Sequence, residues 1–500
     1  MTSPLILAID QGTSSTKCLL VDRTGRVVAQ GQAAVGQATP LPGWVEQDPA
    51  EIWDSVRRAV AATVTADTAQ HVSAIGLSTQ RESCVIWDRK TGEPLSPVLS
   101  WQDNRTEEFC RTLRARGVDR LIRAKTGLPL DPMFSAAKAK WLLDRIDPDR
   151  VMARRGDLVI GTIDAFLLSR FGGEALVEAG NASRMQLVDI ATISFDAELL
   201  NIFNLPAAAM PRIVPSIGPF PQARGLAPLP DGVPVMAVMA DSHAALFAHG
   251  AFAPGPIKAT QGTGSSVMGL IDAGKIQNGE GLHPGVCLTV AWWLDAPALA
   301  FEGNIRSAGA TLAWTAELLG VDAEELAKLA ATVADAGNVH FVPGFNGLGA
   351  PWWDDGAVAT LSGLTLGSGR AAVARAALDS VAHQIADVTD AVRSSDLPVE
   401  RVLVDGGASR NDQLMQFEAD MIGVPVIRTG MAELSALGVA HLAGLAGGLF
   451  TLGQLGELER GETVFKPAIA PAERETKRDA WRAALARSLS KDNRQDFRRQ

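Results

Sequence analysis

The sequence predicts an α/β protein built from two domains of similar design. Three observations predict this class: the chain has 500 residues, strand-like apolar runs alternate with helical patterns, and one short phrase occurs twice. The phrase is DQGTSSTKCLLVD at residues 10–22 and QGTGSSVMGLID at residues 261–272. A chain of this length exceeds what one hydrophobic core usually supports, so we expect each copy to belong to its own domain.

Each copy of the phrase is predicted to be a β-turn-β unit. The first copy follows the apolar run LILAI at 5–9, and the second follows PIKAT at 256–260. A further run, VPVMAVMA at 233–240, ends at Asp241 much as LILAI ends at Asp10. Short apolar runs bounded by glycine and hydroxyl-bearing residues are typical of buried strands joined by tight turns.

The remaining elements follow from periodicity and composition. Apolar residues at three- and four-residue spacing predict helices at 50–66, 135–146 and 370–395. A strand is expected at 400–407, and the Pro- and Gly-rich stretch 211–232 is expected to connect elements across the surface. The charged C-terminal tail is expected to be a solvated helix that frays at its end. The predicted domains are residues 1–248 and 249–455, followed by a helical tail at 456–500.

Composition excludes several functional classes. Hydrophobic residues make up 47% and charged residues 20%, as in ordinary globular proteins. The net charge of −10 argues against non-specific binding to nucleic acid or to an anionic membrane. The four cysteines lack metal-ligand spacing and are expected to be reduced, buried thiols. We expect a cytoplasmic protein, because neither a signal peptide nor an apolar stretch of about 20 residues is present.

The first turn carries groups that suit a polyphosphate. Its glycine allows close approach of the backbone, and successive N–H groups can surround an anion. Asp10, at the end of the preceding strand, could hold a hydrated Mg²⁺. The side-chain donors are the hydroxyls of Thr13, Ser14 and Ser15 and the ammonium group of Lys17. Taken alone, this turn could equally be an ordinary tight hairpin.

The second copy makes a polyphosphate site the stronger interpretation. Gly264 replaces Ser14 and Val267 replaces Lys17, so the second turn offers backbone donors with little charge. Two such turns on two similar domains could face each other and hold one polyphosphate. A third glycine-rich junction, VDGGASRND at 404–412, follows a predicted strand. There Gly407 would let a base lie against the backbone, and Asn411 could hydrogen-bond to a nucleoside.

With these motifs, the chain resembles the FGGY family of carbohydrate kinases, and within it the glycerol kinases. The resemblance extends over nearly the whole chain, in AIDQGTSST and in TQRES (79–83), SWQDNRT (100–106), GTIDAFLLSRFGG (161–173), FVPGFNGLGAPWWD (341–354), VDGGASRNDQLMQFEADMIGVPV (404–426) and SALGVAHLAGLAGG (435–448). It implies two ribonuclease-H-like domains of the actin and hexokinase type on either side of a central cleft. It further implies ATP-dependent phosphorylation of a small polyol or sugar, with Mg²⁺, by a homo-oligomer such as a dimer.

The resemblance also implies a role for individual residues. Asp10 would position Mg²⁺, and Asp241 would be the general base that accepts the hydroxyl proton. The two phosphate walls would be Thr13, Ser14, Ser15 and Lys17 on one side and Thr263 and Gly264 on the other. The nucleoside would be held by Gly309, Gly407 and Asn411. The acceptor would be held by Arg81, Glu82 and Trp101, with Met133, Asp241, Ser242 and Ser266 completing the pocket.

Three pocket positions depart from the pattern of glycerol kinases. Met133 stands where tyrosine is usual, Ser242-His243 where two glutamines are usual, and Ser266 where phenylalanine is usual. Polar sites discriminate strongly when a hydrogen bond is lost, so a larger polyol or ketose of four or five carbons, such as erythritol or xylulose, is an alternative to glycerol. Ala313 replaces a glutamine on the nucleotide side. His243 is expected to be a packed helix residue, although it could tune Asp241.

A different class of function fits the same fold: a nucleotide-switched binding protein with little transfer activity. Such a protein would not need a pocket built to hold a hydroxyl group. The presence of Asp10, Asp241 and the set Arg81, Glu82 and Trp101 therefore favours the enzyme.

Overall fold

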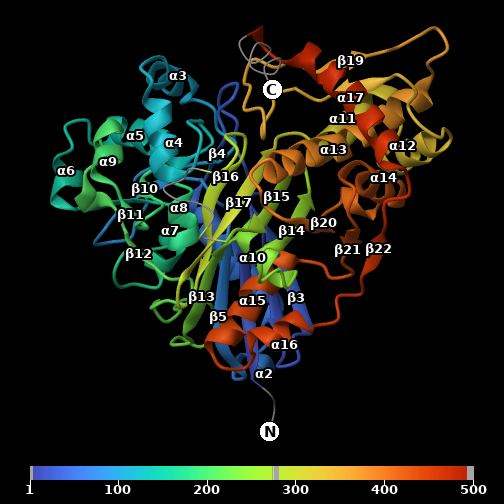
Figure 1. Cartoon of the computed structure of the whole chain (residues 1–500). Coiled ribbons are helices and arrows are strands. Elements are labelled where there is room, and N and C mark those ends of the chain that lie inside the picture. Colours follow the sequence, from blue (N-terminus) through green and yellow to red (C-terminus); the bar gives the residue numbers. More distant parts are fainter. Residues whose placement is uncertain (1–3, 273, 275–280, 492–500) are drawn as a thin grey trace.

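The first half of the chain is organised around a sheet with strand order β13-β5-β1-β2-β3 (Figure 1). The computed structural model describes residues 4–272, 274 and 281–491. The strands are β1 (Leu5–Gln11), β2 (Ser15–Val21), β3 (Val27–Ala34), β5 (Val72–Thr79) and β13 (Val235–Ala240). The first three form an antiparallel meander, while β5 runs parallel to β1 and β13 runs parallel to β5. Parallel strands carry their carboxyl ends to one edge of the sheet, so Asp10 and Asp241 come to the same edge.

A second sheet repeats this plan, with strand order β16-β17-β15-β14-β20-β21-β22. Its strands are β14 (Gly255–Gln261), β15 (Ser265–Leu270), β16 (Cys287–Trp293), β17 (Pro297–Ile305), β20 (Val399–Asp405), β21 (Val426–Arg428) and β22 (Thr463–Phe465). Here β14, β15 and β17 form the meander, and β20 and β21 continue the sheet in parallel with β14. The repeated phrase is therefore a β-turn-β unit in both sheets, as predicted. We call residues 12–14 the first turn and residues 262–264 the second turn.

The predicted helices form at the expected places. They are α1 (Pro49–Thr63), α5 (Ser135–Ile146) and α13 (Arg370–Arg393). The other helices near the two sheets are α2 (Ala66–Ala69), α10 (Asp241–Ala248), α11 (Gly309–Leu319), α12 (Ala323–Ala331), α14 (Asp412–Ile422), α15 (Leu434–Ala446) and α16 (Leu452–Gly456). The apolar faces of α1 and α13 are buried, which explains why their three- and four-residue spacing identified them.

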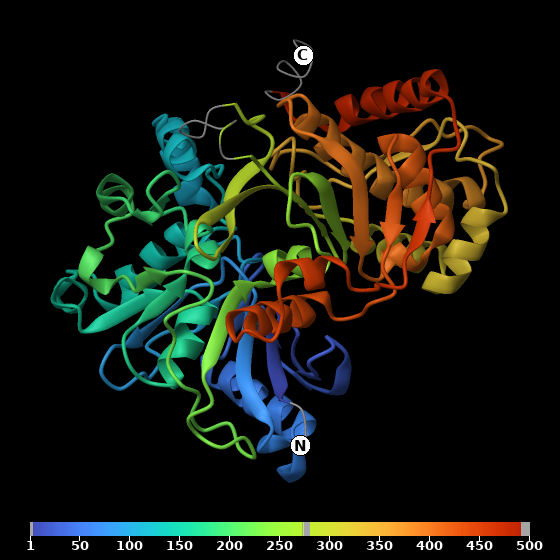
Figure 2. The same cartoon turned by 60° about the horizontal axis from the view of Figure 1, so that its bottom comes forward.

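Helix α15 joins the two halves of the chain. It follows the strands of the second sheet in sequence but packs on α10 and on β1, β5 and β13 of the first sheet (Figure 2). A Cβ atom on Gly438 would lie 1.8 Å from the carbonyl oxygen of Ala244, so this close helix pair requires glycine there. Residues 434–446 therefore pack with the first sheet, although the predicted second domain, 249–455, contains them.

An accessory region is inserted between β5 and β13, on the left of Figure 1. Besides α5, its helices are α3 (Glu107–Ala115), α4 (Val118–Thr126), α6 (Val151–Arg155), α7 (Ile163–Arg170), α8 (Ala179–Ser183) and α9 (Ala197–Ile202). Short strands accompany them, among them β6 (Val85–Asp88), β8 (Leu158–Gly161), β9 (Leu176–Glu178) and β12 (Arg212–Val214). The stretch 211–232 was expected to be only a connection, but β12 within it pairs with β9.

The C-terminal tail is more buried than the sequence suggested. Helix α17 (Pro471–Ser488) was expected to be solvated, yet Trp481 is 1% exposed and stacks on His383 of α13, with ring centroids 4.8 Å apart. Arg478 of the same helix pairs with the buried Asp387 at 2.5 Å. The expectation was wrong because one face of this charged helix is covered by α13.

The cysteines agree with the expectation from composition. All four cysteines are free and buried. In the part of the chain that the structure describes, no helix has the length and apolar character needed to cross a bilayer.

Candidate active site

Glutamine side chains hold the first turn in place. Gln47 donates from Nε2 to the carbonyl oxygen of Thr13 at 2.7 Å. Gln80 donates from Nε2 to the Oε1 atoms of both Gln47 and Gln11, each at 3.1 Å. Amide side chains both donate and accept, so this arrangement fixes the turn without placing a charge beneath it. The hydroxyl and N–H groups of the turn can then face an anion.

The second turn is held by close backbone contacts with the start of α11. Gly309 donates its N–H to the carbonyl oxygen of Gly262 at 2.9 Å, and a Cβ atom on Gly309 would lie 2.5 Å from that oxygen. A Cβ atom on Gly264 would lie 2.4 Å from the carbonyl oxygen of Ile305. Side chains at these two glycines would collide with backbone, so the turn can reach this position only without them.

A cavity of about 830 Å³ opens beside the second turn. Its lining brings together four of the residues predicted to hold a nucleotide: Thr263, Gly309, Gly407 and Asn411. Ala313 lines the same cavity, together with apolar side chains that include Leu326 and Leu378. A mostly apolar cavity with a few polar groups at one end is typical of sites for a nucleoside.

Two of these residues leave room for a base and a sugar. Apart from its two neighbours in the chain, no described residue has an atom within 4 Å of the position that a Cβ atom on Gly407 would take, so this glycine faces open space. Asn411 caps α14, and its Oδ1 accepts the N–H of Leu414 at 2.9 Å. Its Nδ2 group is then the part that can donate to a ligand.

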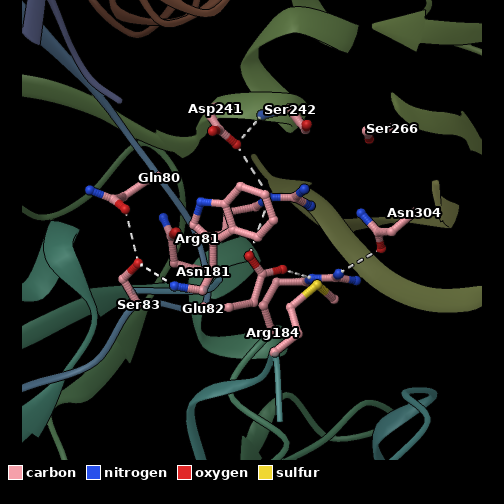
Figure 3. A network of polar contacts seen from close by, with 12 residues as sticks. Gln80, Arg81, Glu82, Ser83, Asn181, Arg184, Asp241, Ser242, Ser266 and Asn304 are labelled. Atoms are coloured by element: carbon pink, nitrogen blue, oxygen red, sulfur yellow. Dashed lines mark hydrogen bonds and ion pairs between the residues drawn. The ribbon is translucent and has the colours of Figure 1, made fainter. Parts of the chain in front are cut away.

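Asp241 lies at the carboxyl end of β13, where α10 begins. Its Oδ1 accepts the N–H of Ser242 at 2.6 Å and lies 3.2 Å from Nε of Arg81 (Figure 3). The side chain is 35% exposed, so the carboxylate is accessible to a ligand. Burial raises the pKa of Asp241, while the positive charge of Arg81 opposes that rise and Glu82 adds to it.

A buried ionic network lies below Asp241. Arg81 donates from Nη1 to Oε2 of Glu302 at 2.7 Å, and Arg184 reaches the same oxygen at 3.0 Å. Arg184 also donates to Oε1 of Glu82 at 2.7 Å, whereas Arg81 and Glu82 themselves are 3.9 Å apart. Although burial alone would raise it, the two arginines hold the pKa of Glu302 well below its usual value. The predicted Arg81–Glu82 pair is therefore part of a four-membered network.

The network continues to the side of the pocket formed by the second sheet. Ser266 donates its hydroxyl to Oε1 of Glu302 at 2.9 Å, and Asn304 donates its amide to the same oxygen at 2.9 Å. Asn304 also accepts from Arg184 at 3.2 Å. Figure 3 shows Ser266 and Asn304 on one side of Arg81, with Asp241 and Ser242 above it. Hydroxyl and amide groups therefore surround the ionic network, and groups of these kinds complement an alcohol.

Trp101 connects the acceptor residues with the first turn. Its indole Nε1 donates to Oγ1 of Thr13 at 2.9 Å, and its backbone N–H donates to Oγ of Ser83 at 3.1 Å. Ser83 in turn donates to Oε1 of Gln80, which braces the turn. The predicted phosphate and acceptor residues thus share one hydrogen-bonded unit.

Met133 and His243 are packed among neighbouring side chains. Met133 packs against the small apolar cluster of Leu128, Phe134 and Cys287. His243 is fully buried, and neither of its ring nitrogens has a hydrogen-bond partner among the described residues. Burial and the charge of Arg81 hold the pKa of His243 well below its usual value, so the imidazole is neutral. His243 is thus a packed helix residue, as expected.

Asp10 has the properties of a site for a hydrated cation. Its Oδ1 is buried and has no hydrogen-bond partner within the described ranges. Burial and the nearby Asp241 raise the pKa of Asp10 to about 7, which a divalent cation would reverse. No group of three or more His, Cys, Asp or Glu residues that could hold a metal ion occurs among residues 4–272, 274 and 281–491. A cation here would therefore depend on Asp10, water and ligand oxygens, as Mg²⁺ often does.

Lys17, predicted to bind phosphate, forms an ion pair with a carboxylate. Its Nζ lies 2.6 Å from Oε2 of Glu433, the residue immediately before α15. Both side chains are about one-third exposed, at 35% and 33%. An incoming phosphate would have to compete with this carboxylate for the ammonium group.

Sequence reasoning missed Arg184, Glu302 and Asn304. Glu302 could have been found, because a single acid inside the strand-like run ALAFEGNI indicates a buried charge with a partner. Arg184 and Asn304 had no such signal. Arg184 binds Glu82 and Asn304, which are 102 and 120 residues away in sequence, so only the folded chain identifies this connection.

Comparison with known proteins gives a consistent result. Residues 5–248 match the model of the N-terminal domain of the FGGY family of carbohydrate kinases, and residues 257–447 match the model of its C-terminal domain. The chain is 40% identical to glycerol kinase of Janthinobacterium sp. (strain Marseille), over 97% of this chain and 99% of that protein.

Solved structures agree with these sequence matches. Glycerol kinase of Plasmodium falciparum, crystallised with ADP, superposes with a TM-score of 0.89 at 28% identity, covering 98% of this chain and 99% of that chain. Xylulose kinase of Rhodospirillum rubrum superposes with a TM-score of 0.83 at 25% identity, covering 96% and 98%. The chain thus has the two-domain fold of these kinases.

Proposed function

The chain belongs to the FGGY family of carbohydrate kinases, and on that premise we propose that Asp241 accepts the proton of a polyol hydroxyl while that oxygen attacks the γ-phosphorus of ATP. Family membership and the full-length similarity to glycerol kinases make the protein an ATP-dependent kinase of polyols or sugars. The roles of individual residues and the identity of the acceptor are the proposal. In such transfers, most of the acceleration comes from alignment and from neutralising the phosphate charge.

The position of Asp241 carries the proposal. Its carboxylate is accessible and lies 3.2 Å from Arg81. It is also close enough to Asp10 that its negative charge, together with burial, raises the pKa of Asp10. The carbonyl of the adjacent Ser242 accepts from Lys258 of β14, the strand that leads into the second turn. Asp241 is therefore near Asp10 at the end of β1 and is joined through Ser242 to β14, which supports a triphosphate that ends at Asp241.

The nucleotide would occupy the cavity beside the second turn. The base and ribose would lie against Gly309, Gly407 and Asn411, and the phosphates would extend between the two turns towards Asp241. Mg²⁺ held through water at Asp10 would neutralise negative charge on the phosphate oxygens. The hydroxyls of the first turn and the N–H groups of the second would donate to these oxygens.

The acceptor would lie on the Arg81–Glu82–Glu302 network, beneath Asp241. Its hydroxyls could donate to the carboxylates and accept from the guanidinium of Arg81. Ser266 and Asn304 add hydroxyl and amide groups to the wall of the pocket. These small polar side chains support an acceptor of three to five carbons, with glycerol and a four- or five-carbon polyol or ketose as the candidates.

A panel of acceptors tests this function. ADP release is measured with Mg·ATP and each polyol or sugar from three to six carbons, with water alone as the control. We expect one acceptor to exceed the water rate by at least about a hundredfold, as the alignment of a bound hydroxyl provides. Equal rates for every acceptor and for water would contradict the proposal and favour the nucleotide-switched binding protein.

A further inference from the structure

Arg306 lies where three segments of the chain meet. It directly follows β17, the strand that carries Glu302. Its Nη2 lies 2.8 Å from Oδ2 of Asp131 and 2.7 Å from Oδ1 of Asp355, and its Nη1 donates to the carbonyl oxygen of Asn346 at 2.7 Å. Asp131 belongs to the first half of the chain, whereas Asn346 and Asp355 belong to the second. One guanidinium therefore bridges the two halves.

Asp131 connects this bridge with the acceptor pocket. It lies in the segment between α4 and α5, residues 127–134, which we call the acceptor loop because it carries Met133. Oδ1 of Asp131 accepts the backbone N–H of Met133 at 2.8 Å, while its Oδ2 is bound by Arg306. The two oxygens of one carboxylate thus hold both the acceptor loop and the arginine.

The backbone of Arg306 connects the bridge with the phosphate side. A Cβ atom on Gly264 of the second turn would lie 3.3 Å from the carbonyl oxygen of Arg306 and 2.4 Å from that of Ile305. No side chain fits between them, so the second turn rests directly on residues 305 and 306. Movement of Arg306 would therefore displace both the second turn and the acceptor loop.

We propose that Arg306 is a positioning residue that sets the distance between the acceptor loop and the second turn, and so aligns the acceptor hydroxyl with the phosphoryl group. It touches neither reactant. This inference rests on the proposed transfer from ATP to a polyol, and it adds a residue through which the two substrates are placed relative to one another.

The physical argument depends on the burial of Asp131. Its side chain is 7% exposed, and Arg306 is its ion-pair partner. Removing one member of such a pair leaves the other charge buried and uncompensated, so the loop that carries it must move towards water. A displacement of about 1 Å at a reacting centre can cost about a hundredfold in rate. Asp355 is less dependent on Arg306, because it is 31% exposed and Arg114 lies 3.7 Å away.

The test compares Arg306→Ala and Asp131→Asn with the wild-type enzyme and with a control, Arg212→Ala. Asp131→Asn keeps an Oδ1 acceptor for Met133 and removes only the charge. The control removes an arginine that makes two hydrogen bonds, 2.9 and 2.8 Å long, to Glu174 at the surface of the accessory region. Steady-state kinetics are measured with acceptor and ATP varied separately, and hydrogen–deuterium exchange is followed at residues 131–134.

For both variants we expect kcat/KM for the acceptor to fall by about ten- to a hundredfold, while KM for ATP changes by less than about threefold. Exchange at residues 131–134 should accelerate. The Arg306→Ala/Asp131→Asn double variant should be no worse than the more impaired single variant, because both changes break the same pair. Arg212→Ala should match the wild type in every respect.

Several results would overturn the proposal. One is that kcat/KM for the acceptor stays within about twofold of the wild type in both variants. Another is an equal loss for acceptor and ATP with unchanged exchange at 131–134, which indicates a merely structural role. If Arg306→Ala does not fold, Asp131→Asn decides the question. If the wild-type enzyme transfers to no acceptor, the proposed function fails, and the exchange at 131–134 still decides whether Arg306 holds the loop.

Discussion

The Nε atom of Arg81 lies 3.2 Å from Oδ1 of Asp241. This contact sets the protonation of the proposed base, because burial alone would favour the neutral acid. The positive charge of Arg81 opposes the rise in pKa that burial causes, and so favours the ionised carboxylate that can accept a proton. The same arginine binds Glu302, so the charge that controls Asp241 is itself fixed by the second sheet.

Arg81→Ala should shift the pH dependence of the reaction. Without the guanidinium, the pKa of Asp241 rises further. As the pH is lowered, the carboxylate therefore becomes protonated, and can no longer act as a base, at a higher pH than in the wild type. We expect the acid limb of kcat/KM for the acceptor to move up by about one pH unit or more. A pH–rate profile between pH 5 and 9 measures this. A rate that falls equally at every pH, with an unmoved midpoint, would contradict the role of Arg81.

Gly407→Ala tests the nucleotide cavity. The added methyl group meets no protein atom within 4 Å and projects into the space proposed for the base. We expect KM for ATP to rise by about tenfold, while the melting temperature and KM for the acceptor remain near the wild-type values. Gly456→Ala is the matched control, since a Cβ atom there also meets nothing within 4 Å and lies outside the cavity. Unchanged nucleotide affinity in Gly407→Ala would place the base elsewhere.

Ser266→Phe tests the size of the acceptor. The substitution removes the hydroxyl that donates to Glu302 and introduces an aromatic side chain. We expect the ratio of kcat/KM for glycerol to that for a four- or five-carbon acceptor to rise by about tenfold, because the pocket becomes smaller. The panel of acceptors measures this ratio for both proteins. A constant ratio would show that this position does not select the acceptor.

Glu418→Gln should change how stability depends on pH. Burial raises the pKa of Glu418 to about 8, and Gln261, which ends β14, donates to its Oε2 at 2.7 Å. The folded state therefore binds this proton more tightly than the unfolded chain. The associated stability is present below the ordinary pKa of 4.5 and is lost as pH rises through about 8, by up to about 1.4 kcal/mol per pH unit in between.

The neutral variant should not lose this stability. We expect Glu418→Gln to match the wild type near pH 5 and to melt at a higher temperature at pH 8 to 9. Thermal unfolding followed by circular dichroism across this range gives the comparison. If the melting temperatures of the two proteins change with pH in the same way at all pH values, Glu418 does not titrate as described.

Local patterns predicted much of the fold. The repeated phrase identified both β-turn-β units because short apolar runs and glycine-rich turns are local signals. The helices at 50–66, 135–146 and 370–395 were predictable because their buried faces repeat with helical spacing. The tail helix was misjudged, since the burial of Arg478 and Trp481 depends on a partner, Asp387, that lies about ninety residues away.

The site was predicted only in part, because some of its residues have partners that are distant in sequence. Arg81 and Glu82 were singled out as a pair, but their strongest partners, Glu302 and Arg184, come from distant parts of the chain. Periodicity and motif spacing describe neighbours in sequence, and pairing across two sheets is a property of the folded chain. The bridge made by Arg306 could not be foreseen for that reason.

In the proposed complex, two turns, one from each sheet, hold a single triphosphate whose end meets the carboxylate at position 241. Asp241→Asn tests it most directly, because the amide keeps the shape of the side chain and cannot accept the proton. Phosphoryl transfer to the preferred acceptor and binding of Mg·ATP by calorimetry are measured on the same preparation. We expect transfer to fall by about a thousandfold or more, with ATP affinity within about threefold of the wild type. Phosphoryl transfer at the wild-type rate would contradict the role of Asp241 as the base that meets the triphosphate.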